Sequence, residues 1–190
     1  MKIILASASP RRKELLAGLD MDFEVRLLPG IEECYPDDLP TAKIAEYIAR
    51  EKAAAYNGDI GDDELLLTAD TIVVVDDEVL GKPADEEDAR RMLRMISGRT
   101  HQVITGVCLA TREKTRSFSV ETDVTFKALK DSEIDYYIKQ YRPFDKAGAY
   151  GIQEWIGYIG VESIRGSYFN VMGLPVQRIY NEIKRLSEER

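Results

Sequence analysis

The stretch that most constrains the fold is residues 65–75, LLLTADTIVVV, a nearly continuous run of apolar and β-branched side chains. Such a run is typical of a strand covered on both faces of a sheet, because it has no polar face to turn toward water. Asp76-Asp77 then predict a turn, and a second short strand ends at Gly81-Lys82-Pro83. We therefore expect the rest of the chain to be organised around a buried hairpin.

Asp70 lies in the middle of this apolar run. A buried carboxylate is costly unless it is paired with a cation, bound to a metal or open to a wet cleft. Thr68 and Thr71 flank it, so a local capping or turn role is the alternative to a functional one. Lys82, on the turn after the hairpin, could reach back to the same region. An aspartate and a lysine delivered by one hairpin suit a charged substrate such as a phosphate with its metal.

Length and composition predict one large globular domain. The chain has 190 residues, of which 44% are hydrophobic and 32% charged, and this is enough for a substantial core. No apolar run approaches the roughly 20 residues of a membrane helix. The first ten residues lead straight into Arg11-Arg12-Lys13 and predict a first strand rather than a signal peptide, which favours a cytoplasmic protein.

Charge and rare residues exclude several classes of function. The net charge of −8 argues against long nucleic acids, because neutralisation of phosphates supplies most of that affinity. A nucleotide needs only a local cluster of cations and is not excluded. His101 is the only histidine, which removes Ser-His-Asp and multi-histidine metal sites. Cys34 and Cys108 lie far apart without metal spacing, so we expect free thiols.

The segment after the first strand has the features of an anion site. Ser9 as N-cap and Pro10 at the first helical position predict a helix start. Ser7, Arg11 and Arg12 add a hydroxyl and two guanidinium groups to it. Helix N-termini bind anions through free N–H groups, and arginines bind phosphate oxygens in pairs. The alternative is a well-capped helix whose arginines are solvated.

Residues 41–56 predict a second helix in which Lys52 continues the inward row of Ile44 and Ile48. Lys52 either extends along its stem to water or points into a cleft. Glu33 lies in the acidic loop before this helix. It is either a metal ligand or a solvated loop charge.

The remaining pattern predicts alternating strands and helices. We expect Tyr141 and Tyr180 to face inward on their helices. The expected elements are a strand at residues 23–27, a helix at 84–96, strands at 99–110 and 117–126, a helix from 131 or 132 to about 141, a strand at 155–164, a loop at 166–173 and a helix opened by Pro175.

Residues 145–153, DKAGAYGIQ, combine two glycines with polar side chains. Glycines let a backbone approach a ligand closely. A tight bend between elements would explain the glycines but not the accompanying Asp145, Lys146, Tyr150 and Gln153.

Taken together, ordered blocks between residues 3 and 175 resemble the Maf family of nucleoside triphosphate pyrophosphatases. Each block alone is a weak signal, whereas the ordered set is highly specific. The blocks are Ser7-x-Ser9-Pro10-Arg11-Arg12, Glu51-Lys52-Ala53, Ala69-Asp70-Thr71, Gly81-Lys82-Pro83, Ser97-Gly98-Arg99-Thr100-His101, Thr105-Gly106, the segment 145–153 and Asn170-Val171-x-Gly173-Leu174-Pro175.

The resemblance implies an α/β fold with an elongated mixed sheet and flanking helices, similar to inosine triphosphatases, with two lobes around a cleft. Residues 1–190 would form a single Maf-like domain. The implied activity is hydrolysis of a nucleoside triphosphate between the α and β phosphates, giving monophosphate and pyrophosphate with a divalent cation, Mg²⁺ or Mn²⁺. We expect a cytoplasmic homodimer that binds neither nucleic acid polymers nor membranes.

Carried over by position, the resemblance makes Asp70 the general base, or alternatively a metal ligand. It implies phosphate contacts by Ser9, Arg12, Lys52 and Lys82, and makes Glu33 a metal or cleft carboxylate. Base choice is implied for Arg11, Thr71 and Gln153. These three residue types are similar to the dTTP/UTP pyrophosphatase branch, with a role in clearing modified pyrimidine nucleotides.

Three alternatives stay open at this point. The 7-methyl-GTP branch tends to have a bulky aromatic residue in place of Arg11 and lacks the Gly-Ile-Gln sequence. A regulator of cell division (septum formation) would act through protein contacts, and a nucleotide sensor would bind without turnover. Glu154-Trp155 departs from the small residue that more often follows Gln153 in the family, and could reshape a base pocket.

Overall fold

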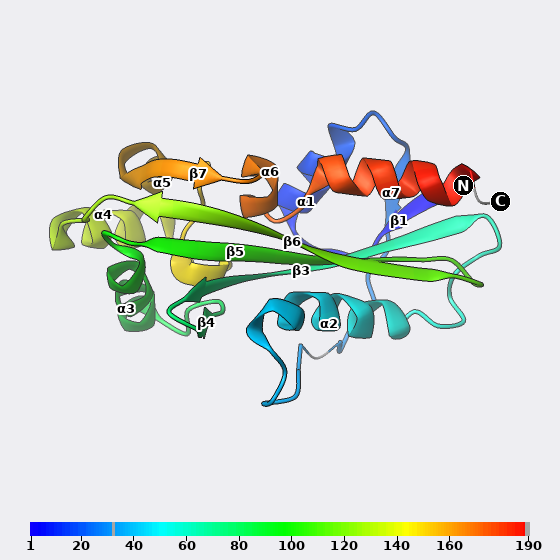
Figure 1. Cartoon of the computed structure of the whole chain (residues 1–190), viewed down its shortest axis with the longest axis horizontal. Coiled ribbons are helices and arrows are strands. Elements are labelled where there is room, and N and C mark those ends of the chain that lie inside the picture. The colour runs from blue at the N-terminus through cyan, green and yellow to red at the C-terminus, as the bar shows by residue number, and fades with distance from the viewer. Residues whose placement is uncertain (32, 189–190) are drawn as a thin grey trace. The chain divides into compact units, whose positions relative to one another are not determined.

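The computed structural model describes residues 1–31 and 33–188. In these residues, strands and helices alternate along most of the chain (Figure 1). The elements are β1 (Lys2–Leu5), α1 (Pro10–Ala17), β2 (Phe23–Val25), α2 (Thr41–Ala54), β3 (Glu64–Val75), β4 (Glu78–Leu80), α3 (Glu86–Ile96), β5 (Thr100–Ala110), β6 (Thr115–Phe126), α4 (Asp131–Tyr141), the 3₁₀ helix η1 (Ala147–Ala149), α5 (Trp155–Gly160), β7 (Val161–Arg165), α6 (Tyr168–Val171) and α7 (Val176–Glu188).

The described residues contain one seven-stranded sheet in the order β2-β1-β3-β5-β6-β7, with β4 paired to β3. β1 is parallel to β2 and β3, whereas β4 is antiparallel to β3 and β7 to β6. The prediction of a mixed α/β sheet with flanking helices is therefore confirmed. The expected hairpin is also present, because β3 and β4 pair Val75 with Glu78 across the Asp76-Asp77 turn.

The chain divides into two compact units. The first contains residues 1–70, 105–120 and the chain from Gly173 onward, and the second contains residues 71–104 and 121–172. The long strands β3, β5 and β6 therefore contribute residues to both units. The single domain over residues 1–190 stays a prediction.

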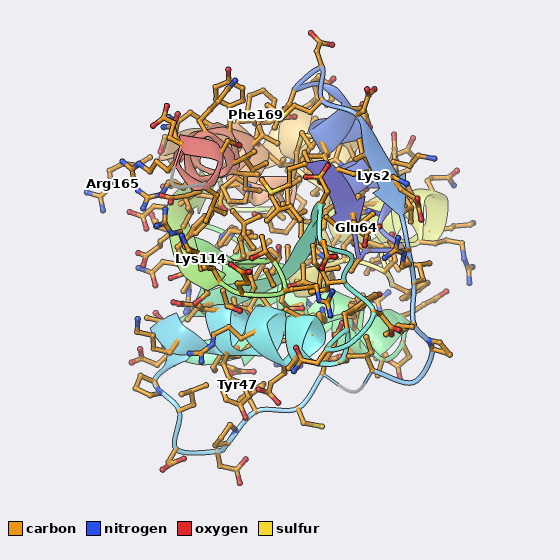
Figure 2. All side chains as sticks on the ribbon, turned by 90° about the vertical axis from the view of Figure 1, so that its right-hand side faces the viewer. Lys2, Tyr47, Glu64, Lys114, Arg165 and Phe169 are labelled. Carbon is orange, nitrogen blue, oxygen red and sulfur yellow. The ribbon has the colours of Figure 1, made fainter. Side chains whose placement is uncertain are left out.

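In the first unit, helices cover both faces of the strands. α2 lies on one side, and α1 and α7 lie on the other (Figure 1). Ala49, Ala53 and Tyr56 pack against Ile4 and Leu66 on the α2 side. Neighbouring strand residues point to the opposite face, so the buried β3 run needs a helix on each side. Figure 2 shows this unit end-on, with Tyr47 on the outer side of α2 and the register pair Lys2 and Glu64 on adjacent strands.

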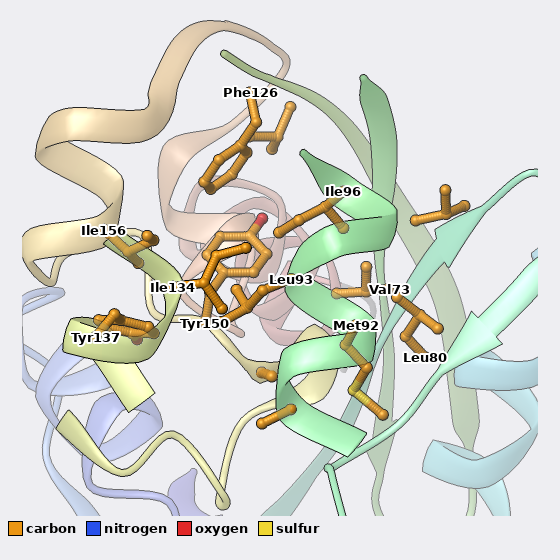
Figure 3. Packing of buried hydrophobic residues seen from close by; sticks show 14 of the residues in the cluster. Val73, Leu80, Met92, Leu93, Ile96, Phe126, Ile134, Tyr137, Tyr150 and Ile156 are labelled. Carbon is orange, nitrogen blue, oxygen red and sulfur yellow. The ribbon is translucent and has the colours of Figure 1, made fainter. Parts of the chain in front are cut away.

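The second unit has its own apolar core between α3, α4 and the β3–β4 hairpin (Figure 3). Leu93 and Ile96 from α3 meet Ile134 and Tyr137 from α4, and Tyr150 lies against Phe126 with ring centroids 5.1 Å apart. These aromatic rings are fully buried or nearly so. The core holds the segment that precedes Gln153.

The prediction of one strand over residues 155–164 is wrong. Residues Trp155–Gly160 form α5, and only Val161–Arg165 form β7. A Cβ on Gly157 would lie 1.8 Å from the Ile152 carbonyl oxygen, and one on Gly160 would lie 2.8 Å from the Phe126 ring. Close packing at two glycines, which a strand pattern does not reveal, therefore overrides the apolar and aromatic β propensity of this stretch.

Three smaller expectations also fail. Residues 166–173 contain the short helix α6, capped by Ser167, whose side chain accepts from the Asn170 backbone N–H. Tyr141 and Tyr180 are 39% and 40% exposed. Glu182 takes an inward position on α7 instead, because arginines neutralise its carboxylate, among them Arg116 at 3.0 Å.

Candidate active site

Asp70 is the last residue of β3 that belongs to the first unit, and it is 8% exposed. Thr68 lies two residues earlier and therefore on the same face of the strand. Its hydroxyl donates to the Ala49 carbonyl of α2 at 2.6 Å. Asp70 consequently faces α2, one helical turn beyond Ala49.

Lys52 projects from that turn of α2 and meets Asp70. Its Nζ lies 2.8 Å from Asp70 Oδ1 and 2.7 Å from Glu33 Oε1, and it donates to the Ala69 carbonyl at 3.4 Å. Only 13% of the Lys52 side chain is exposed, against 46% for Glu33. Lys52 therefore does not extend along its stem to water, and its position in a cleft stays a prediction.

Gly106 explains how α2 comes near enough to the sheet. A Cβ at Gly106 of β5 would lie 2.1 Å from the carbonyl carbon of Ala45 and 2.2 Å from its oxygen. These distances fall far below any contact between atoms that are not bonded. α2 therefore rests its backbone directly on β5, and this places Lys52 beside Asp70.

Arg12 is held at the start of α1 by backbone carbonyls. Its Nη1 donates to the Ala69 carbonyl at 2.9 Å, and its Nε donates to the Gly173 carbonyl at 2.9 Å. Nη1 also reaches Ser7 Oγ at 3.5 Å. Burial lowers the pKa of the Arg12 guanidinium from its ordinary value, and the nearby carboxylates of Asp70 and Glu33 oppose that shift.

Ser9 is the N-cap of α1, as predicted. Its hydroxyl accepts from the Arg12 backbone N–H at 3.4 Å, and Pro10 occupies the first turn. Arg11 lies close enough that its positive charge contributes to lowering the pKa of Arg12. The first unit thus brings together Ser9, Arg11, Arg12, Glu33, Lys52 and Asp70.

Thr71, Lys82 and Gln153 belong to the second unit. Lys82 is exposed on the turn after β4. The Gly148 N–H donates to the Gly81 carbonyl at 3.1 Å, and a Cβ on Gly148 would lie 2.9 Å from Val73. The β3–β4 hairpin and the segment 145–153 therefore lie side by side, so Gly148 lets two protein segments pack closely, and the approach of this backbone to a ligand stays a prediction.

The carboxylates near Lys52 fit one kind of metal site. Within residues 1–31 and 33–188, no group of three or more His, Cys, Asp or Glu side chains could hold a metal ion. Glu33 and Asp70 nevertheless both direct an oxygen at one cationic group, Lys52 Nζ. Mg²⁺ usually binds through one or two carboxylates together with substrate phosphates and water. Two converging carboxylates suit that mode and do not suit an all-protein cage.

Several groups of the site carry no signal in the sequence. The carbonyls of Ala69 and Gly173 are backbone acceptors, so their side chains do not identify them. In the second unit, Tyr137 lies near Gln153 and has the pattern of an ordinary core residue, whereas the sequence singles out Lys146 with the glycines of segment 145–153. Cys34 has an exposed thiol and Cys108 a buried one, and burial raises the pKa of Cys108 to about 11.

A buried carboxylate paired with a lysine, beside an arginine fixed at a helix start, has the chemistry that suits an anionic substrate. The chain belongs to the Maf family: the family model described as Maf-like protein matches residues 2–186. A curated relative from Phocaeicola vulgatus is 66% identical over 97% of this chain and 96% of its own length. A relative from Parabacteroides distasonis is 60% identical over 96% of this chain and 95% of its own length. Both relatives are named dTTP/UTP pyrophosphatase.

Similarity to solved structures is more distant. The Ham1 protein of Staphylococcus aureus is 12% identical, with a TM-score of 0.46 over 66% of this chain and 72% of that one. A nucleoside-triphosphatase (dITP/XTP pyrophosphatase) of Mycobacterium abscessus is 18% identical, with a TM-score of 0.42 over 68% and 76%. The inosine-triphosphatase likeness and the cleft between two lobes stay predictions. No helix in the described part of the chain is long and apolar enough to cross a membrane.

Proposed function

We propose that this protein hydrolyses nucleoside triphosphates, with dTTP and UTP favoured, between the α and β phosphates. The observation that carries the proposal is the Lys52–Asp70 pair at 2.8 Å, set beside Arg12 in the unit that contains the capped start of α1. Relatives that are 58–66% identical over nearly the whole chain and bear the name dTTP/UTP pyrophosphatase support it.

In this proposal Asp70 is the general base. A water molecule attacks phosphorus at the α–β bridge, the bridging P–O bond breaks, and the proton of the water passes to the Asp70 carboxylate. The products are the nucleoside monophosphate and pyrophosphate. Lys52 holds Oδ1 of Asp70, which orients the carboxylate and leaves Oδ2 as the oxygen that we assign to the water.

The phosphates are assigned to cationic and hydroxyl groups. Arg12 and Lys52 neutralise charge that develops on the leaving group, and fixed cations are effective in this role because they need not reorganise during the reaction. We add Ser9 at the start of α1 and Lys82 on the hairpin turn. A phosphate that binds Lys52 Nζ would displace the Glu33 carboxylate from it, wholly or in part.

Glu33 and Asp70 would hold a divalent cation, Mg²⁺ or Mn²⁺, together with substrate phosphates. Such an ion polarises phosphoryl oxygens and stabilises the charge of the transition state. Asp70 would then serve the ion, the water or both in turn.

Base choice is assigned to Arg11, Thr71 and Gln153. Uracil and thymine share an edge of two carbonyls flanking one N–H, and a glutamine amide offers both a donor and an acceptor to it. A site that hydrogen-bonds one edge rejects other edges strongly, because buried groups are then left unpaired. This chemistry extends to modified pyrimidines that keep the same edge.

We also propose a cytoplasmic homodimer. The test is light scattering coupled to size-exclusion chromatography, in which a dimer has twice the 21.5 kDa mass of the chain. A mass of one chain at micromolar concentration contradicts the dimer and leaves the proposed chemistry in place.

The test of the activity is a panel of dTTP, UTP, dATP, dGTP and dCTP with Mg²⁺ or Mn²⁺, followed by assay of pyrophosphate. We expect dTTP and UTP to have the highest kcat/KM. Asp70→Asn keeps the side-chain shape but removes the base, so turnover should fall about 10²- to 10⁴-fold. Asp76→Asn, in the exposed turn of the same hairpin, is the matched control and should keep full activity.

Two results would overturn this proposal. One is near wild-type turnover in Asp70→Asn with an unchanged circular dichroism spectrum, which removes the base. The other is orthophosphate rather than pyrophosphate as the product, because the enzyme would then cleave between the β and γ phosphates.

A further inference from the structure

The second unit contains a polar network next to Gln153 that the proposed function does not use. We name it the Tyr137–Glu154–Lys146 network after its three side chains. The Tyr137 hydroxyl donates to Glu154 Oε2, and Lys146 Nζ lies 3.1 Å from Glu154 Oε1. The Gly151 backbone N–H donates to the same tyrosine oxygen at 3.0 Å. Both carboxylate oxygens of Glu154 are thus engaged.

The network is buried among apolar side chains. Tyr137 is fully buried in the second core (Figure 3), and the side chains of Lys146 and Glu154 are 10% and 20% exposed. Burial raises the pKa of Tyr137 well above its ordinary value, and the Glu154 carboxylate acts in the same direction. The hydroxyl therefore stays protonated at neutral pH and donates. Buried polar groups that are mutually satisfied lock one another into a single geometry.

What this geometry fixes is the backbone on both sides of Gln153. Gly151 is held by Tyr137, and the Glu154 N–H donates back to the Gly151 carbonyl at 3.0 Å. A Cβ on Gly151 would lie 3.0 Å from both the Glu154 and the Lys146 side chains, so the network also packs against this backbone. On the far side, Gly157 lies against the Ile152 carbonyl. Gln153 has little freedom to shift.

The Gln153 side chain carries an unmet hydrogen-bonding demand. Within residues 1–31 and 33–188, its buried Oε1 has no hydrogen-bond partner. A buried acceptor without a donor is unfavourable, and the contacts of the flanking residues fix the backbone from which the Gln153 side chain projects. The N–H of a pyrimidine edge is a donor that this oxygen would accept.

We propose that the Tyr137–Glu154–Lys146 network is a positioning device that holds Gln153 ready to read the pyrimidine edge. This inference rests on the proposed function and deepens it: Tyr137 and Glu154 act through Gln153 and touch no substrate. Selectivity for the base then depends on side chains outside the base site.

The experiment measures kcat/KM for UTP and dCTP in a set of variants. Tyr137→Phe removes only the hydroxyl and leaves both Glu154 Oε2 and the Gly151 N–H unpaired. We expect the UTP-to-dCTP ratio to fall about tenfold, mainly through a higher KM for UTP. Glu154→Gln keeps an acceptor for Tyr137 and should lose less than Glu154→Ala. Tyr141→Phe is the matched control, because Tyr141 stacks on Tyr137 at 5.2 Å but is itself exposed.

The decisive comparison is made in the Gln153→Ala background. If the network acts through Gln153, Tyr137→Phe adds no further loss of the ratio there, because residues that act as one unit are not additive. A full additional loss in that background would overturn the inference. So would an equal loss for both nucleotides, which indicates a merely structural role. Melting temperatures of all variants identify any that fail to fold, and Glu154→Gln then replaces Tyr137→Phe.

The two proposals fail in different ways. Wild-type protein that does not prefer dTTP and UTP contradicts the proposed substrates. The network is then tested with the ratio of kcat/KM for the preferred nucleotide to kcat/KM for the others. The inference again requires that Tyr137→Phe adds no further loss of this ratio in the Gln153→Ala background. Wild-type protein that prefers UTP, with a ratio unchanged in Tyr137→Phe, contradicts the network alone.

Discussion

Lys52 joins two carboxylates of very different exposure, and its removal therefore has two separable consequences. Asp70 is left as a nearly buried carboxylate without its lysine, whereas Glu33 at 46% exposure can turn to water. Removing one partner of a buried ion pair is destabilising because the other charge stays uncompensated. The same lysine is assigned to the phosphates.

We predict that Lys52→Ala lowers kcat/KM for dTTP about 10²-fold or more and lowers the free energy of unfolding by about 1–3 kcal/mol. The double variant Lys52→Ala/Asp70→Asn should recover most of the lost stability and remain inactive, since no buried charge is then left alone. Urea unfolding and steady-state kinetics measure the two effects. A single variant with full activity would remove Lys52 from the site.

At the scale of residues, periodicity predicted Asp70 and Lys52 but not their contact. The β3 run singled out Asp70 as a carboxylate in an apolar strand, and the row from Ile44 and Ile48 placed Lys52 inward. The carbonyls that hold Arg12 could not be predicted, because a backbone acceptor has no residue type to mark it. The contact of Glu33 with Lys52 depends on the conformation of the loop before α2, and a loop has no hydrophobic periodicity from which to predict it.

At the scale of elements, α2 is the helix whose position the site depends on most. Its backbone approaches β5 at Gly106, where a Cβ would meet Ala45 and Glu46 backbone atoms within 2.2 Å. Backbone atoms of a helix cannot move aside singly, so any side chain at residue 106 must displace the whole helix. Lys52 would move with it.

We predict that Gly106→Ala destabilises the protein by about 1–3 kcal/mol or more and lowers activity beyond the fraction that unfolds. Gly18→Ala is the matched control. Its Cβ would have only an ordinary 3.4 Å contact at the end of α1, so it should be neutral or slightly stabilising. Thermal melts and kinetics below the melting temperature separate the two effects. Wild-type activity in a folded Gly106→Ala protein would show that α2 does not position the site.

The elements that the sequence predicted well are those with a strong period or a side-chain cap. α1 begins after Ser9 and α3 after Asp85, and in both the side chain of the cap residue accepts a backbone N–H of the first turn. α5 escaped prediction because tertiary contacts at Gly157 and Gly160 outweigh the β propensity of its residues. Its aromatic pair, Tyr136 and Trp155 at 4.8 Å, joins α4 to α5 and has no local sequence signal.

At the scale of the whole molecule, the two units are interleaved in the chain. Between residues 70 and 173 the chain passes from one unit to the other four times. Three of these crossings lie inside single strands, β3, β5 and β6. Neither unit is therefore a continuous segment that could be cut out, and we expect one cooperative unfolding transition, as for a single domain.

Titration of two buried or paired groups gives a test of that expectation. His101 in the second unit is 1% exposed, and burial lowers its pKa from 6.5 to about 4. Below pH 6.5 the unfolded chain therefore binds a proton that the folded protein does not, and stability falls until about pH 4. Glu64 in the first unit has a pKa of about 2, lowered first by its hydrogen bond with Arg26. Its contribution is complete above pH 4.5 and is lost as the pH falls toward 2.

We predict that the free energy of unfolding falls by about 3 kcal/mol between pH 6.5 and 4 through His101, and falls further at lower pH through Glu64. His101→Gln should remove the fall in the free energy of unfolding between pH 6.5 and 4 and leave the fall at lower pH unchanged. Glu64→Gln should remove the fall at lower pH and leave the one between pH 6.5 and 4 unchanged. Urea melts from pH 7 to 3, followed by circular dichroism, measure both slopes. If the units unfold together, both substitutions shift the same single transition although they lie in different units. Two resolved transitions, each moved by only one of the substitutions, would show that the chain is not a single folding domain.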